Sequence, residues 1–146
     1  MTNMENQPDI LQKRPSKELY YLNIAQAVAL RSTCRRRKYG AVLVKDDRII
    51  STGYNGAARG EPNCTDLDIC PRAALSIPHG ERYELCKAVH AEANAILNAA
   101  PADMNGAVLY LAGWEDGRPI LNPKPCSMCE RLIRNARIAG VVVMKA

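Results

Sequence analysis

Two short motifs, each at the expected start of a helix, constrain most tightly how this chain can fold. The first is His90-Ala91-Glu92, and the second is Pro125-Cys126-Ser127-Met128-Cys129. Residues three apart lie on one face of a helix, so Cys126 and Cys129 can both reach a single ion. Helix N-termini carry positive partial charge and free N–H groups, which favour the thiolate that a metal requires. A fold that uses both motifs in one site must bring these two helix starts together.

The metal-binding residues of the two motifs are His90, Cys126 and Cys129. This set suits zinc and leaves the fourth tetrahedral position for water, as catalytic sites do, whereas structural sites are usually closed by four protein ligands. Bound zinc can lower the pKa of water to around 7 and so supply hydroxide at neutral pH. As an alternative, Cys126 and Cys129 could form a thioredoxin-like dithiol or be plain buried cysteines.

Glu92 is the candidate proton carrier, because it would lie beside the water without binding the metal. On an ideal helix, His90 and Glu92 point about 200° apart, so they cannot share a helix face. They can share a site that lies beyond the helix end, which a position in the first turn provides.

Hydrophobic periodicity predicts an α/β fold with the element order α-β-β-α-β-α-β. Ser16 can cap the first helix, and Pro101 ends the second. Strands separated by one helix are expected to pair in parallel, and the first two strands to form an antiparallel hairpin. The result is a mixed sheet with helices on its faces, a three-layer α/β/α arrangement. We expect helices at residues 16–31, 90–100 and 127–136, and strands at residues 41–44, 49–54, 107–111 and 141–144.

The length of 146 residues fits one domain, which we place at residues 15–146 after a flexible N-terminal tail at residues 1–14. No apolar run approaches the roughly 20 residues that span a bilayer. The polar N-terminus lacks the apolar region of a signal peptide. We therefore expect a cytoplasmic protein without a membrane partner.

The formal charge of +5 suits an anionic partner such as a nucleotide. The basic run Arg35-Arg36-Arg37-Lys38 could contact such a partner or be a solvated loop. Aromatic residues make up only 5% of the chain, and there is no Phe, so platforms for stacking bases are hard to assemble. Nucleic acid is therefore not the expected partner.

A His-x-Glu motif combined with Pro-Cys-x-x-Cys is the signature of zinc nucleobase deaminases. The chain resembles the cytidine and deoxycytidylate deaminase superfamily, and within it the deoxycytidylate (dCMP) deaminase branch. The resemblance covers most of the chain from Cys34 to Val143. The segments that carry it are Tyr39-Gly40-Ala41-Val42-Leu43-Val44, Thr52-Gly53-Tyr54-Asn55-Gly56, Val89-His90-Ala91-Glu92-Ala93-Asn94-Ala95-Ile96 and Pro125-Cys126-Ser127-Met128-Cys129.

The resemblance implies a cytidine-deaminase-like fold and a zinc-dependent hydrolytic deamination, with dCMP converted to dUMP. Zinc-bound hydroxide would attack C4 of cytosine, while Glu92 protonates N3 and then the departing amine. The resemblance also implies that Asn55 touches the base or sugar, although Asn55-Gly56 could simply form a turn. Arg59 follows this turn and could bind the 5′-phosphate, or be an exposed loop arginine.

Three of the remaining cysteines, Cys64, Cys70 and Cys86, lie in or border a long irregular stretch at residues 55–85. Loops of this length are usually functional or need a cross-link to order them. Some dCMP deaminases carry an additional zinc, and a closed structural site of three cysteines and one histidine would order this loop. Three reduced loop cysteines are the alternative, and Cys34 is expected to be a small buried residue. The candidate ligands of the second zinc are Cys64, Cys70, His79 and Cys86.

The chain departs from the family pattern in two places. The stretch from Gly113 to Lys124 is longer than the usual entry into the last helix, and no fifth strand or terminal helix follows the fourth predicted strand. An unpaired fourth strand would expose a sheet edge. A homo-oligomer, either a dimer or a hexamer, could cover it.

Two other functions fit parts of the pattern. A tRNA adenosine deaminase carries a similar signature and would use the basic run to contact RNA. A catalytically silent zinc module could serve as a binding or regulatory protein, but it would not need Glu92. The Gly-Tyr-Asn-Gly segment and the scarcity of aromatic residues favour deamination of a free nucleotide.

Overall fold

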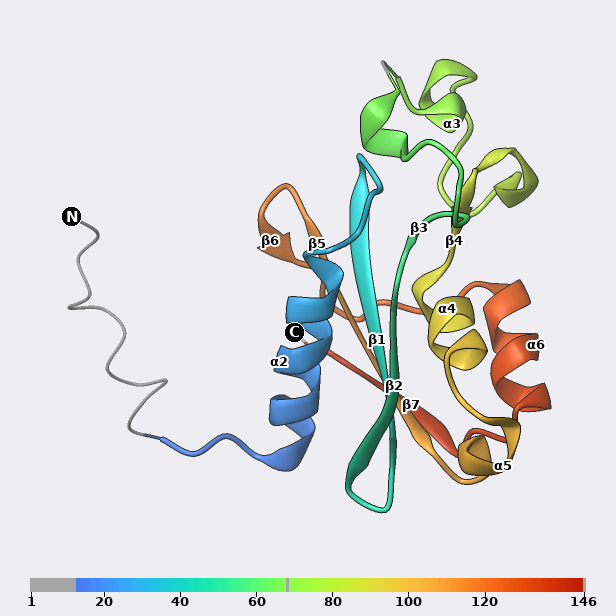
Figure 1. Cartoon of the computed structure of the whole chain (residues 1–146). Coiled ribbons are helices and arrows are strands. Elements are labelled where there is room, and N and C mark those ends of the chain that lie inside the picture. The colour runs from blue at the N-terminus through green and yellow to red at the C-terminus, as the bar shows by residue number, and fades with distance from the viewer. Residues whose placement is uncertain (1–12, 68, 146) are drawn as a thin grey trace.

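The computed structural model of the chain describes residues 13–67 and 69–145, so the tail predicted at residues 1–14 lies almost wholly outside it. Figure 1 shows three layers, with helix α2 (Lys17–Ala29) on the left of a central sheet and α4 (Ala91–Leu97), α5 (Pro101–Met104) and α6 (Ser127–Asn135) on its right. This arrangement confirms the predicted α/β/α fold. Within the described residues no helix combines the length and the hydropathy needed to span a membrane.

The sheet is mixed and is built around β1 and β5, whose residues are all buried or half-buried. β1 pairs antiparallel with β2 and also with β5, and β5 pairs in parallel with β7. The predicted first hairpin and the predicted parallel pair are therefore confirmed. The strands of this sheet are β1 (Arg37–Lys45), β2 (Arg48–Tyr54), β5 (Val108–Glu115), β6 (Arg118–Pro119) and β7 (Gly140–Val143).

The second and third predicted strands, β2 and β5, do not pair as neighbours, because β1 lies between them. The expectation that strands separated by one helix pair directly was wrong for these two. Five consecutive residues of β1 are buried, whereas exposed positions recur along β2. A strand with both faces covered suits the sheet interior, and a half-exposed strand suits its edge.

Helices cover both faces of the sheet. Ser16 caps the first of them, since its hydroxyl accepts a hydrogen bond from the N–H of Leu19. Pro101 does not directly end the second helix, which stops at Leu97. It begins a further short helix instead. The helices are α2 (Lys17–Ala29), α3 (Pro71–Ala74), α4 (Ala91–Leu97), α5 (Pro101–Met104) and α6 (Ser127–Asn135).

Alternate residues of β1 divide the core between the two faces, as the two-residue period of a strand requires. Ala41 and Leu43 pack with residues of α4, β5 and α6. Val42 and Val44 pack with Tyr21 and Ala25 of α2. The sheet thus holds α2 on one side and the two helices of the predicted site on the other.

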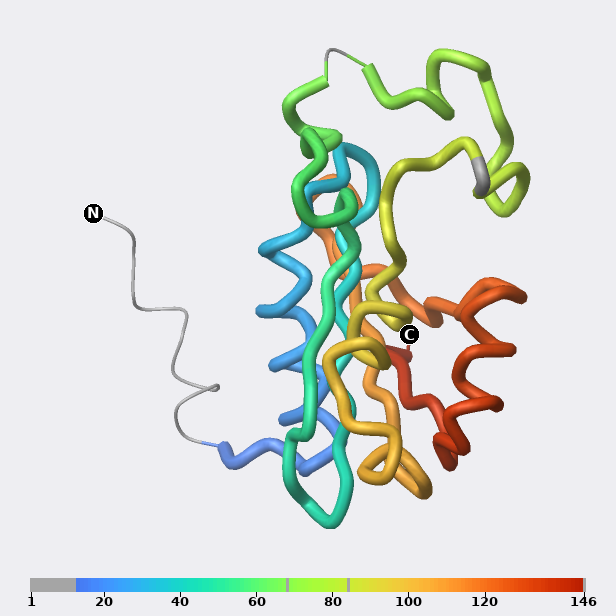
Figure 2. Tube along the Cα trace, turned by 45° about the vertical axis from the view of Figure 1, so that its right-hand side comes forward, coloured from blue at the N-terminus to red at the C-terminus, as the bar shows by residue number. Residues whose placement is uncertain are grey.

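The long stretch from residue 55 to residue 89, here called the arch, contains short helices and strands and passes over one end of the sheet (Figure 2). Its 3-10 helices are η2 (Cys64–Asp66) and η3 (Tyr83–Leu85). Its two short strands, β3 (Gly56–Ala57) and β4 (Ala88–Val89), pair antiparallel. This pair joins the two ends of the arch directly before α4.

α4 packs unusually close to β2 at Gly53. A Cβ atom at this position would lie 2.3 Å from Ala95 N and 2.5 Å from Ala91 O, both backbone atoms of α4. Around this contact, the Ser51 hydroxyl donates to Ala95 O at 2.7 Å, and Asn94 Nδ2 donates to Tyr54 O at 2.8 Å. The close approach therefore sets the position of the helix that follows His90.

We predict that Gly53→Ala lowers the free energy of unfolding by about 1–3 kcal/mol, because overpacking a dense contact costs that much. Gly140→Ala is the matched control, since a Cβ atom at Gly140 meets nothing within 4 Å. Urea denaturation followed by circular dichroism measures both variants. Equal stability of the two would contradict the close contact between α4 and β2.

Candidate metal and catalytic site

The predicted metal ligands lie at two adjacent helix starts. His90 is the N-cap of α4, with φ −69° and ψ 153°, and Cys126 is the N-cap of α6, with φ −68° and ψ 167°. Both residues are extended rather than helical, so their side chains leave the helix ends toward a shared space. The geometric conflict between His90 and Glu92 on one ideal helix therefore does not arise, because only Glu92 belongs to the helix.

The donor atoms of the three residues face one another. His90 Nδ1 lies 3.4 Å from Cys126 Sγ and 3.4 Å from Cys129 Sγ. All three donor atoms lie within 4.8 Å of each other, and no other such group of three or more occurs among the residues that the structure describes. Imidazole nitrogen and two sulfurs at such spacing match the donor types of a zinc site.

The electrostatic setting of these thiols favours a bound cation. Burial raises the pKa of Cys129 far above its usual range, and the Glu92 carboxylate and Cys126 raise it further. A thiolate at Cys129 is thus costly while only anionic or neutral groups surround it. A divalent cation reverses this balance and deprotonates a coordinating thiol. The residues present therefore fit zinc.

Glu92 is 5% exposed, in the first turn of α4. Its side chain lines the same cavity as His90 and Cys126, and the cavity has a volume of about 200 Å³. A cavity of roughly 150 Å³ accommodates benzene, so this space is large enough for a pyrimidine ring. Glu92 therefore lies where a buried carboxylate can meet a base held beside the donor cluster.

Asn55 lines this cavity too, but its side chain also supports the fold. Asn55 Oδ1 accepts from the N–H of Tyr39 at 2.8 Å, and Asn55 Nδ2 donates to Arg37 O at 2.8 Å. These bonds hold the start of β1 against Asn55, which lies between β2 and β3. One N–H of the amide group and one lone pair of its oxygen are still available to a ligand.

Arg59 lies elsewhere. Its side chain is exposed, its Nη2 is 3.4 Å from Asn98 Oδ1, and it is not among the residues that line the cavity. The structure thus does not bring Arg59 together with the donor cluster.

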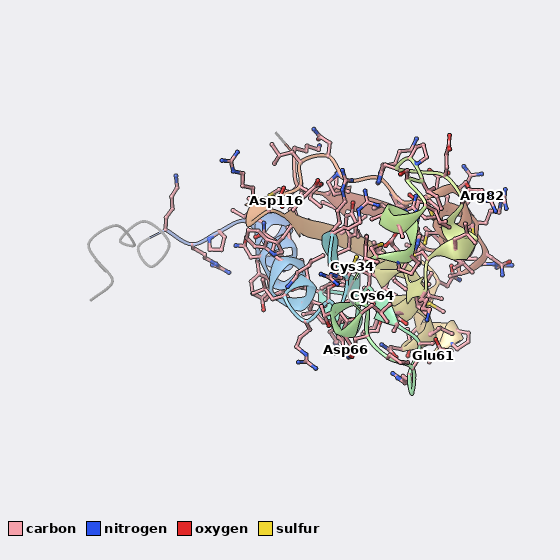
Figure 3. All side chains as sticks on the ribbon, turned by 90° about the horizontal axis from the view of Figure 1, so that it is seen from above. Cys34, Glu61, Cys64, Asp66, Arg82 and Asp116 are labelled. Atoms are coloured by element: carbon pink, nitrogen blue, oxygen red, sulfur yellow. The ribbon has the colours of Figure 1, made fainter. Side chains whose placement is uncertain are left out.

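The four candidate ligands of a second zinc do not form a close donor group among the described residues. Burial raises the pKa of the Cys64 thiol, and the neighbouring thiols Cys34, Cys86 and Cys70 raise it further. Figure 3 shows Cys34 and Cys64 near each other, viewed from above. By contrast, His79 Nε2 lies 3.4 Å from Arg37 Nη1. The sequence prediction thus missed the proximity of Cys34 to Cys64.

Two further residues of the cavity escaped the sequence prediction. The Tyr83 ring meets the His90 ring edge-on at 5.1 Å, and the Arg72 guanidinium lies 4.8 Å from the centre of the Tyr83 ring. Both come from the arch over the sheet end. The sequence there has no helical or strand periodicity that would indicate which side chains point inward. A lone aromatic residue and a lone arginine carry no distinguishing sequence signal.

Comparison with known proteins adds independent support for the site. The family model described as the cytidine and deoxycytidylate deaminase zinc-binding region matches residues 15–145. Among curated relatives, the deoxycytidylate deaminase of Mycobacterium phage D29 is 42% identical over 137 residues, which cover 90% of this chain and 97% of that protein. The deoxycytidylate deaminase of Schizosaccharomyces pombe is 37% identical over 88% of this chain, but the match spans only 37% of its length.

A solved structure agrees with the fold. The dCMP deaminase of cyanophage S-TIM5, in its apo form, superposes with a TM-score of 0.61 at 26% identity, covering 88% of this chain and 82% of that one. The family match spans both helix starts and the strands between them. The chain belongs to the cytidine and deoxycytidylate deaminase family.

Proposed function

We propose that the chain is a zinc-dependent hydrolase that deaminates dCMP to dUMP. The observation that carries this proposal is the cluster of His90, Cys126 and Cys129 at a cavity that is lined by His90, Cys126 and buried Glu92. The relatives from phage D29 and S. pombe, both named deoxycytidylate deaminase, support dCMP as the substrate. Deamination consumes one water and releases one ammonia, so the site must move protons as well as bind the base.

His90 Nδ1 and the sulfurs of Cys126 and Cys129 would hold the metal. Zinc in such a site supplies Lewis-acid activation of water at neutral pH. The helix starts at α4 and α6 stabilise the negative charge of the thiolates and of Glu92 through their free N–H groups. The edge of the Tyr83 ring limits how the His90 ring can turn, so it keeps Nδ1 directed at the two thiols.

Glu92 moves the protons. Its carboxylate accepts one proton from water as the water oxygen bonds to C4, and it delivers a proton to N3 of the base. It then carries the second proton to the amino group, which leaves C4 as ammonia. Burial of Glu92 suits this role, because a carboxylate shielded from bulk water exchanges its proton with the substrate instead.

Asn55 positions the nucleotide in this proposal. Its fixed amide offers one free N–H to a base or sugar oxygen, and the two hydrogen bonds to β1 prevent the amide from turning. Arg59 remains a candidate for the 5′-phosphate only if the exposed loop that carries it moves toward the cavity.

A second, structural zinc is also part of the proposal. The thiols of Cys34, Cys86 and Cys70 raise the pKa of Cys64, which supports a site in the arch with Cys34 in place of His79 as the fourth ligand. The arch would have to close further around a metal, because these sulfurs do not form a close donor group among the described residues. Such a site would fix the arch to the start of β1. The hydrogen bond from Thr65 N to Thr33 O already connects the two.

We also propose that the chain self-associates and that it is cytoplasmic. Residues 15–146 form one deaminase domain in this proposal. Among the described residues β2 pairs in the sheet only with β1, so a second copy of the chain could cover the outer edge of β2. Sedimentation of the purified protein distinguishes a monomer from a dimer or a hexamer.

We predict that Glu92→Gln lowers kcat for dCMP by a factor of about 10²–10⁴, the usual contribution of a general acid–base residue. Ammonia release from dCMP, CMP, deoxycytidine, cytidine and a tRNA anticodon stem measures the activity. Metal analysis should show that the variant retains its zinc. Glu130→Gln, in α6, is the matched control and should keep full activity.

Three outcomes of this experiment contradict the proposal. Deamination of the tRNA stem but not of dCMP would identify a tRNA-editing enzyme. Wild-type inactivity on every substrate with zinc bound would indicate a catalytically silent module. Full activity of Glu92→Gln would remove Glu92 from the chemistry.

Metal content tests the two zinc sites separately. We predict two zinc ions per wild-type chain, one in Cys129→Ser and one in Cys64→Ser, measured by plasma mass spectrometry. Only Cys129→Ser should abolish deamination, because only that variant loses the ion beside Glu92. One zinc per wild-type chain, lost in Cys129→Ser, would rule out the second site and leave the catalytic site intact.

A further inference from the structure

Positive side chains gather around the cavity that holds the donor cluster. They come from three separate parts of the chain: Arg36 and Arg37 at the start of β1, Arg72 in α3, and Lys124 before α6. Glu92 and Glu115 are the carboxylates of the lining, and Glu115 already pairs with Arg37 at 2.6 Å. Glu92 moves protons in the proposed reaction, so it cannot also pair permanently with one of these positive side chains. The cavity therefore carries an excess of positive charge beyond what its own carboxylates neutralise.

Arg72 differs from the other three in its burial, since only 7% of it is exposed. Its Nη2 donates to Pro78 O at 2.8 Å and to Glu81 O at 2.7 Å. Its Nε is buried and has no hydrogen-bond partner among the described residues. Within that part of the chain no carboxylate pairs with Arg72, so its charge faces only two carbonyl dipoles and the Tyr83 ring.

An unpartnered N–H on a buried guanidinium is rare in folded proteins and needs an explanation, such as a ligand. The guanidinium is planar, permanently charged and shaped to bind a phosphate. Arg72 also lines the same cavity as His90, and the Tyr83 ring contacts both of these residues. A ligand whose base reaches Glu92 and whose anionic group reaches Arg72 would occupy the length of the cavity.

We propose that Arg72 binds the 5′-phosphate of the nucleotide and so makes the enzyme prefer dCMP to deoxycytidine. This inference rests on the proposed deaminase function. The phosphate supplies the counter-charge that the guanidinium lacks, and a small shift of the arch brings the unpartnered Nε into contact. Arg72 takes the role that the sequence suggested for Arg59, whose side chain lies outside the cavity.

The test compares two substrates in the full-length, zinc-loaded protein. Arg72→Gln should lower kcat/KM for dCMP tenfold to a hundredfold, which corresponds to about 1.4–2.8 kcal/mol. The loss should appear mainly in KM, whereas kcat/KM for deoxycytidine should change less than threefold. Arg72→Lys, which keeps the charge, should recover part of the dCMP activity. Arg48→Gln removes an exposed arginine of β2 and should change neither substrate.

The ratio of the two kcat/KM values does not depend on the fraction of protein that is folded, so it separates phosphate binding from support of the arch. Equal losses on both substrates, or inactivity of both Arg72 variants, would overturn the inference and make Arg72 a structural residue. A selective loss in Arg59→Gln instead of Arg72→Gln would overturn it as well. Wild-type inactivity on both substrates would contradict the deaminase function itself, which is a different failure.

Discussion

The close contact between α4 and β2 at Gly53 is the constraint on which the site depends. The backbone of α4 lies so near the strand that a single methyl group would overlap it, and hydrogen bonds from Ser51 and Asn94 hold it there. The helix start is thereby fixed relative to the sheet. α6 packs on the same face through Ile133, so its own start lies beside that of α4. Two helix starts held by one sheet face form a rigid frame for the metal donors.

The donor motifs could be predicted from the sequence because their signals are local, whereas the residues around them could not. Cap residues, Pro125 and the three-residue spacing are local signals, so the sequence could group His90, Glu92, Cys126 and Cys129. In the structure these residues lie close together. Strand order is not local. The periodicity of β2 and β5 gives no sign that β1 lies between them, and only the burial of β1 on both faces explains it.

The arch over the sheet end was the least predictable part. Its side chains follow no helix or strand period, so which of them point inward depends on tertiary contacts. From the sequence alone, Arg59 and Arg72 cannot be told apart as arginines of the same long stretch. In the structure Arg59 is exposed and Arg72 is buried. The same limit applies to the cysteines, because Cys34 precedes β1 and only the folded chain brings it near Cys64. Proximity across the fold, rather than spacing in the chain, selects these residues.

The donor geometry places a zinc ion between His90 Nδ1 and the sulfurs of Cys126 and Cys129, within reach of Glu92. X-ray diffraction from crystals of the zinc-loaded protein with dUMP, measured on both sides of the zinc absorption edge, locates this ion. We expect an anomalous peak about 2.0–2.3 Å from these three donor atoms, the usual range for zinc bonded to nitrogen and sulfur. A fully loaded crystal with no peak there, or a disulfide between Cys126 and Cys129, would contradict it.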